Sequence, residues 1–133
     1  MKIENIKFKA KRLDNGEWVE GDLIHKETYV CIGYLSSEIP NITRVQKVDT
    51  STVCMFTGLK DCKGNEIWEG DMLSNVTNDS PDGIVAFKYG AFCLLAKNGR
   101  DFCVALTYLL SEKDSLNRFK VIGNKFDRKE GKE

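Results

Sequence analysis

The sequence has little histidine and proline, no excess of either charge and no long apolar run. It contains one His and two Pro among 133 residues, and Lys plus Arg equal Asp plus Glu at 20 each. This balance gives no global field that would attract nucleic acid or an anionic membrane. The first residues lack the apolar core of a signal peptide, and no run approaches the length that crosses a bilayer. We therefore expect a cytoplasmic protein with no membrane partner.

Ligand patterns for metals and nucleotides are also missing. The chain has no Gly-x-Gly-x-x-Gly motif and no Walker lysine loop, and its five cysteines lack the close pairs typical of zinc sites. In a reducing cytosol we expect free thiols, with Cys62 exposed in a turn and the others buried, rather than disulfides. A nucleophilic pair of His25 with Cys31 or Cys62 is conceivable, but no cysteine-enzyme signature accompanies it. The sequence thus predicts no cofactor and no metal.

The first half of the chain shows short apolar alternations separated by turn residues. Residues 3–24 predict a hairpin, because Phe8 and Ala10 alternate with lysines before the turn residues Asp14-Asn15-Gly16. A phase shift around Gly21 predicts a bulge or bend. Further strands are expected at 28–35 and, at a sheet edge, 41–47. Asp49 is expected to cap one helical turn that ends near Val53.

The second half continues in the same way. A turn is expected at 61–65, an exposed polar loop at 74–82 and a short helical turn within 107–113. The expected strands cover residues 83–90, 91–97, 101–106 and 119–123, the last at an edge. The Asn98-Gly99 turn would place Cys93 opposite Val104 or Ala105.

These patterns predict a mainly β protein, a β-barrel or β-sandwich of short antiparallel strands with one or two short helical turns. The second half also resembles small SH3-like barrels at the level of the fold. We expect a single compact domain over residues 1–126, with two β lobes, 1–54 and 55–126, as a variant of that organisation. Residues 127–133 are expected to form a charged flexible tail.

A short motif occurs twice. Glu-x-x-Glu-Gly-Asp followed by two apolar residues stands at 17–24 and again at 66–73. We interpret both copies as one local structure, in which a turn and a short aromatic strand precede a Gly-Asp pair that opens the next strand. Chance recurrence of turn residues is the alternative.

Several segments together carry a family resemblance. The longest is 56–73, Phe-Thr-Gly-Leu-Lys-Asp-Cys-Lys-Gly-Asn-Glu-Ile-Trp-Glu-Gly-Asp-Met-Leu, and shorter ones stand at 15–21, 48–53 and 121–124. In this order they resemble the YopX-like proteins of bacteriophages and prophages, mostly of Gram-positive hosts. The resemblance implies a compact phage protein in the cytoplasm of the bacterial host cell. The family has no established activity, so it implies no catalytic residue.

Carboxylates around Gly70 form the first candidate site. Glu66, Glu69 and Asp71, echoed by Glu17, Glu20 and Asp22, have the chemistry to bind a divalent metal or to act as acid and base. Neither a neighbouring His nor calcium-loop spacing supports this, so we favour carboxylates that cap turns by accepting backbone N–H bonds. We therefore expect a protein that is not an enzyme. A metal- or carboxylate-dependent enzyme built on Glu69, Asp71 and His25 is the third hypothesis.

Aromatic and lysine side chains suggest two binding hypotheses. Trp18 and Trp68 stand beside turns, where partly exposed anchors occur, and with the two edge strands they favour a protein-binding or assembly module. Its partner would be an unknown protein or a second copy in a homo-oligomer. The alternative is a nucleic-acid-binding accessory factor, with Lys7, Lys9 and Lys11 on one strand face and Trp18, Trp68 and Tyr89 available for stacking. We favour a solvated lysine face that guards an edge strand, with the aromatics in the core, over that alternative. The candidate interaction residues are Trp18, Trp68, Glu69, Asp71, Lys7, Lys9 and Lys11.

Overall fold

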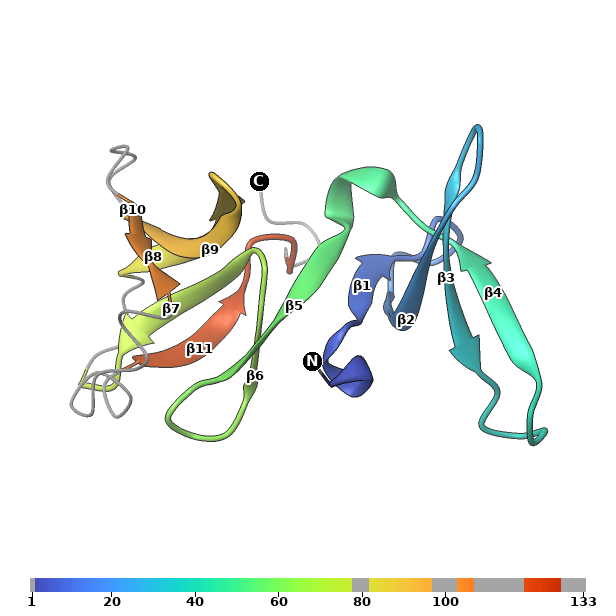
Figure 1. Ribbon diagram of the computed structural model, residues 1–133, viewed down its shortest axis with the longest axis horizontal. Coiled ribbons are helices and arrows are strands. Elements are labelled where there is room, and N and C mark those ends of the chain that lie inside the picture. Colours follow the sequence, from blue (N-terminus) through green and yellow to red (C-terminus); the bar gives the residue numbers. More distant parts are fainter. Residues whose placement is uncertain (1, 78–81, 97–102, 107–118, 128–133) are drawn as a thin grey trace. The chain divides into compact units, whose positions relative to one another are not determined.

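The computed structural model describes residues 2–77, 82–96, 103–106 and 119–127 (Figure 1). The chain divides into two compact units, Met1–Phe56 and Thr57–Glu133. Both are built from antiparallel strands, so the predicted mainly β class is confirmed. The described strands form open sheets rather than a closed barrel. Within those ranges, no helix is both long and apolar enough for a membrane span.

The first unit contains the strands that alternation predicts. One 3-10 turn, η1, precedes these strands, and a second one, η2, lies between β4 and β5. The elements are η1 Ile3–Asn5, β1 Phe8–Lys11, β2 Trp18–His25, β3 Val30–Leu35, β4 Thr43–Lys47, η2 Thr50–Thr52 and the start of β5 Cys54–Lys60. The predicted cap is confirmed, because an Asp49 carboxylate oxygen accepts a hydrogen bond from the Ser51 N–H at 3.0 Å.

The sheet of this unit has the order β4-β3-β2-β1-β5 (Figure 1). Strand β2 changes partner in its middle. Residues up to Gly21 pair with β1, and residues from Asp22 onward pair with β3. A Cβ at Gly21 would overlap the carbonyl oxygen of Gly33, so glycine allows the close approach at this change of partner. The small apolar core consists of Ala10, Val30, Ile32 and Val48.

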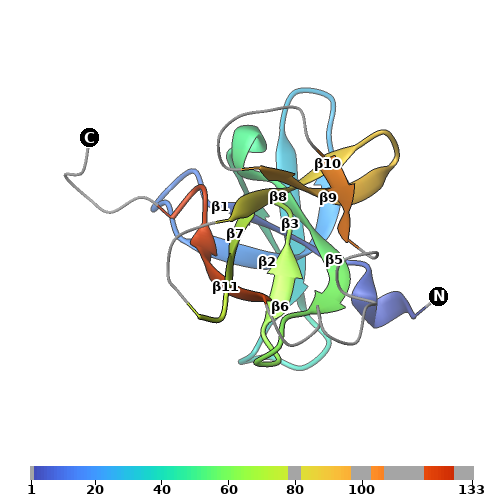
Figure 2. The ribbon, with the colours of Figure 1, turned by 90° about the vertical axis from the view of Figure 1, so that its left-hand side faces the viewer.

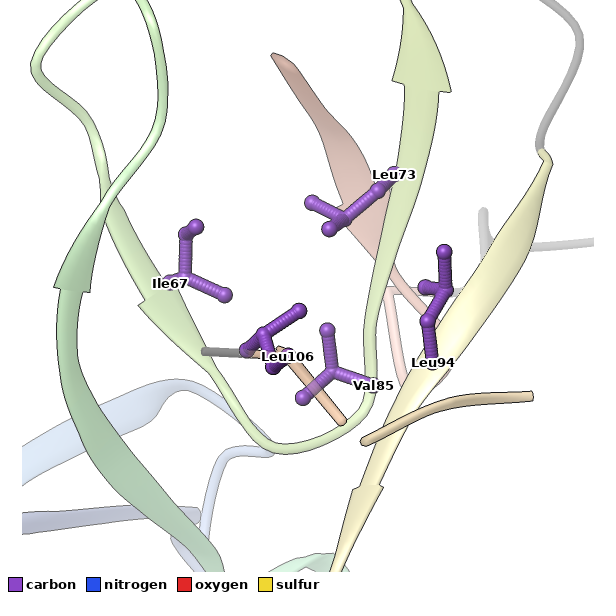
Figure 3. Packing of buried hydrophobic residues seen from close by; sticks show 5 residues of the cluster. All are labelled: Ile67, Leu73, Val85, Leu94 and Leu106. Carbon is purple, nitrogen blue, oxygen red and sulfur yellow. The ribbon is translucent and has the colours of Figure 1, made fainter. Parts of the chain in front are cut away.

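The second unit forms a five-stranded sheet of order β10-β9-β8-β7-β11 (Figures 1 and 2). Its strands are β6 Glu66–Trp68, β7 Asp71–Asn75, β8 Gly83–Lys88, β9 Ala91–Ala96, β10 Cys103–Ala105 and β11 Phe119–Asn124. Strand β6 pairs with the end of β5. The predicted register is confirmed, since Ala105 lies opposite Cys93. The side chains of Ile67, Leu73, Val85, Leu94 and Leu106 converge in the core (Figure 3).

Three sequence-based predictions, on one loop, one strand edge and one thiol, are wrong. Ser74 does not begin an exposed loop, because it is a fully buried residue of β7. Strand β1 is not an edge strand, since it lies between β2 and β5. Cys93 is disulfide-bonded rather than a thiol, whereas Cys31, Cys54 and Cys62 are thiols as expected.

The repeated Glu-Gly-Asp motif does not adopt one structure twice. In the first copy Gly21 lies inside the continuous strand β2. In the second copy Gly70 has a φ of +89° and lies in the turn that separates β6 from β7. The first glycine is needed for close strand approach and the second for a left-handed backbone, so the similarity is confined to the sequence.

The expected Asn98-Gly99 turn and the helical turn within 107–113 lie outside the described residues. So do residues 78–81 of the expected polar loop and residues 128–133 of the expected tail.

Candidate functional site

The signature carboxylate Asp71 is a buried structural acceptor. Its side chain is 3% exposed, and one oxygen accepts the backbone N–H of Trp68 at 2.7 Å. The other oxygen accepts the side-chain N–H of Asn124 at 2.9 Å. Because both oxygens accept hydrogen bonds from within the fold, the arrangement corresponds to a carboxylate that caps a turn.

Asn124 connects the last signature segment to the central one. Its amide group also donates to the backbone carbonyl of Glu69 at 3.2 Å, and its oxygen accepts the N–H of Phe126 at 2.9 Å. The Gly70 carbonyl accepts the N–H of Lys125 at 2.8 Å. Two signature segments that are distant in the sequence therefore join in one hydrogen-bonded cluster.

The second candidate tryptophan, Trp68, is buried rather than a partly exposed anchor, with 5% of its surface accessible. Glu69 is half-buried beside it in the turn, and its backbone carbonyl is the acceptor from Asn124. Within the described residues, no three His, Cys, Asp or Glu side chains are grouped so that they could hold a metal ion. Trp68 and Asp71 of the central motif are thus buried residues of the second unit.

The lysines of β1 lie on one sheet face together with Trp18. The Lys9 and Lys11 ammonium groups stand 4.6 and 5.4 Å from the centre of the Trp18 ring. Lys7 forms an ion pair with Glu20 at 3.2 Å and also lies over the Phe56 ring at 4.8 Å. The structure therefore brings the predicted lysines and Trp18 together, as a cation–aromatic cluster that includes an acidic partner.

His25 does not share a face with Cys31. It is exposed at the end of β2 directly opposite Val30, whereas Cys31 lies opposite Ile24 and is buried. Neighbouring residues of a strand point to opposite faces. A nucleophilic His25–Cys31 pair is therefore excluded by the register.

An aromatic hairpin tip carries Tyr89, which the sequence suggested only as one of several aromatics for base stacking and not as part of a tip. Lys88 pairs with Ala91, which leaves Tyr89 and Gly90 as a two-residue turn between β8 and β9. Tyr89 is 94% exposed, and Phe87 below it is 51% exposed. The Phe87 ring meets the Phe92 ring edge to face, with centroids 5.0 Å apart. A Phe pair that flanks a Tyr-Gly dipeptide is the sequence signal that indicates this tip.

A second apolar surface surrounds the β3–β4 connection in the first unit. It combines two strand residues, 72% and 54% exposed, with two residues of the connecting loop. We call it the apolar hairpin surface; it consists of Leu35, Ile39, Ile42 and Val45. Val45 lies opposite Gly33, which has no side chain to cover it. Exposed apolar groups on an edge strand are uncommon unless they serve an interaction.

A family model described as YopX protein matches residues 7–130, nearly the whole chain, and includes the central segment and the Asn124 segment. No curated protein matches the chain.

Proposed function

Since the chain belongs to the YopX protein family, we propose that it is a phage or prophage protein that acts as a non-catalytic protein-binding or assembly module. The observation that carries this proposal is the apolar hairpin surface, which borders an open strand edge. The signature carboxylate Asp71 supports it indirectly, because both of its oxygens accept hydrogen bonds from within the fold.

The open edge follows from the hydrogen-bond directions of β4. The Ile42 carbonyl accepts the Ser36 N–H at 2.7 Å, and the Val48 N–H donates to Val30 at 3.1 Å, so these two groups point toward β3. Backbone groups alternate along a strand, so those of Thr43 and Val45 point away from β3. At Lys47 the edge is closed, because its carbonyl accepts the Leu13 N–H at 3.2 Å. The stretch from Thr43 to Val45 therefore offers backbone groups next to exposed apolar side chains.

Charge substitution on this surface tests the proposal. We expect Leu35→Lys and Val45→Lys to lower the molar mass measured by light scattering, or to remove proteins that co-purify with the chain from its host. Stability should change by less than about 0.5 kcal/mol, because both side chains are largely exposed. Ile3→Lys is the matched control, since Ile3 is 81% exposed and lies outside this surface. A strict monomer that retains no protein, before and after substitution, would contradict the proposal.

Nucleic-acid binding is the second candidate function. It is favoured by the Lys9, Lys11 and Trp18 cluster, which combines cations with an aromatic ring on one sheet face. Fluorescence anisotropy with labelled single-stranded DNA at low salt tests it. The expected result is salt-dependent binding that weakens in the Lys9→Glu/Lys11→Glu variant. Unchanged anisotropy at low salt would eliminate this candidate.

A further inference from the structure

The β8–β9 turn places a large aromatic side chain where the backbone disfavours it. Tyr89 has a φ of +55° and Gly90 a φ of +80°. Two-residue hairpin turns with two positive φ values prefer Asn, Asp or Gly at the first position. A bulky residue in this region costs about 1–2 kcal/mol. Folding alone would therefore favour Asn at position 89.

The Tyr89 side chain recovers none of this cost through burial in the fold. It is 94% exposed, so the ring lies almost completely in solvent. The hairpin below it is paired from Gly83–Ala96 to Lys88–Ala91, and Phe87 contacts Phe92 edge to face. The hairpin thus presents an exposed Tyr above a half-exposed Phe. A Tyr side chain has only two χ angles, so it loses little conformational entropy when it binds.

We propose that this tip, Tyr89 with the half-exposed Phe87, is an anchor that inserts into an apolar pocket of a different protein. The inference rests on the proposed function and names a second binding surface, located in the other unit from the apolar hairpin surface. Tyr is among the residues most enriched at binding hot spots, where a pocket surrounds the ring and a polar group accepts the hydroxyl. The cost of the left-handed turn is then offset by the contact with the partner.

The charges of the tip favour a protein over a phosphate-bearing partner. Between Phe87 and Phe92 the only charged side chain is Lys88, and the whole chain has no net charge. Attraction to nucleic acid or to an anionic bilayer depends on several cations acting together. A pocket with apolar walls and one hydrogen-bond acceptor would match the aromatic rings of the tip and the single Tyr89 hydroxyl.

Site-specific photo-crosslinking tests the inference. Benzoylphenylalanine is incorporated at position 89 in bacterial host cells that produce the full chain, and the adduct is identified by mass spectrometry. The expected result is one protein adduct that is absent when the same probe replaces Ile3, a control residue that is also exposed and apolar. An adduct only with a second copy of the chain, only with lipid or nucleic acid, or with nothing would overturn the inference.

The purified adduct partner then provides a quantitative test by calorimetry. Tyr89→Asn should weaken its binding at least tenfold while the melting temperature stays equal or rises, because Asn tolerates the turn. Tyr89→Phe should retain part of the affinity because the ring remains. Equal affinity of Tyr89→Asn and the native chain would refute the anchor. Since the variants of the apolar hairpin surface act in the other unit, failure here leaves the test of the proposed function intact.

Discussion

Substitution of Asp61 should show how strongly one turn carboxylate holds the second unit together. Asp61 is 7% exposed at the start of the turn between β5 and β6. One of its oxygens accepts the backbone N–H groups of Lys63 at 2.9 Å and Asn65 at 2.8 Å. The other accepts the N–H of Val121 in β11 at 2.8 Å and the side-chain amide of Asn65 at 3.3 Å. The same carboxylate thus shapes a local turn and fixes a strand 60 residues further along the chain.

The magnitude follows from what each donor does after Asp61→Ala. The Lys63 and Asn65 amides lie in an exposed turn and regain water, so each loses about 0.5 kcal/mol. The Val121 amide is half-buried within the sheet, and a hydrogen bond to a charged acceptor there contributes about 2 kcal/mol. We therefore expect Asp61→Ala to lower the free energy of unfolding by about 3 kcal/mol. Domains of ordinary stability have about 5–15 kcal/mol in total, so this loss is readily measured.

Urea unfolding followed by tryptophan fluorescence measures the change, because the buried Trp68 lies in the same unit as Asp61. Asp61→Asn should cost about 2 kcal/mol, since its amide nitrogen would face the Val121 donor while the oxygen keeps the turn contacts. Hydrogen exchange of the Val121 amide should accelerate in both variants. Lys63→Ala is the control, because it retains the backbone N–H and should change stability by less than about 0.5 kcal/mol. A loss below 1 kcal/mol in Asp61→Ala, or unchanged exchange at Val121, would refute the reasoning.

Two further predictions concern the first unit. Gly21→Ala should lower the free energy of unfolding by about 2–3 kcal/mol, because the alanine Cβ would overlap the Gly33 carbonyl. Thermal or urea unfolding measures this loss, and a neutral effect would show that β2 and β3 separate freely there. The Arg12 side chain donates hydrogen bonds of 2.9 and 2.8 Å to Asp14 and holds the pKa of Asp14 below its ordinary value. Because the folded pKa is the lower one, the stabilisation is complete above about pH 4 and is lost as the pH falls through the folded value. An NMR titration of the Asp14 carboxyl should give a higher pKa in Arg12→Gln, and equal values in both proteins would contradict the pairing.

Local patterns predicted the strands because their causes are local. Alternation of Phe8 and Ala10 with lysines requires one buried face, and Asp14-Asn15-Gly16 supplies the turn. The Asp49 cap and the placement of Cys93 opposite Val104 or Ala105 were predicted for the same reason, since each depends on residues close in the sequence, and the structure has Ala105 there. The family resemblance also rests on short segments, and the match over residues 7–130 confirms it.

Predictions failed where distant residues decide the environment. The sequence left Trp68 open between a core residue and a partly exposed anchor, and only the fold shows that it is buried. Ser74 was predicted to begin a loop, but it lies in β7, which pairs with β11. The two Glu-Gly-Asp copies have the same letters, but Gly21 faces the backbone of β3 and Gly70 faces the side chain of Asn124. Their different roles depend on those neighbours.

The sequence by itself determined the β class, most strand positions, the turn residues and the family of this protein, because alternation and turn preferences act over a few residues. Only the tertiary structure decided that Asp61, Asp71 and Asn124 connect distant segments, since hydrogen bonds between such residues leave no periodic pattern. The tertiary structure also decided which apolar side chains are exposed to solvent. Tyr89 and Val45 are exposed because no other element of the described fold packs over them, and local sequence does not predict such packing.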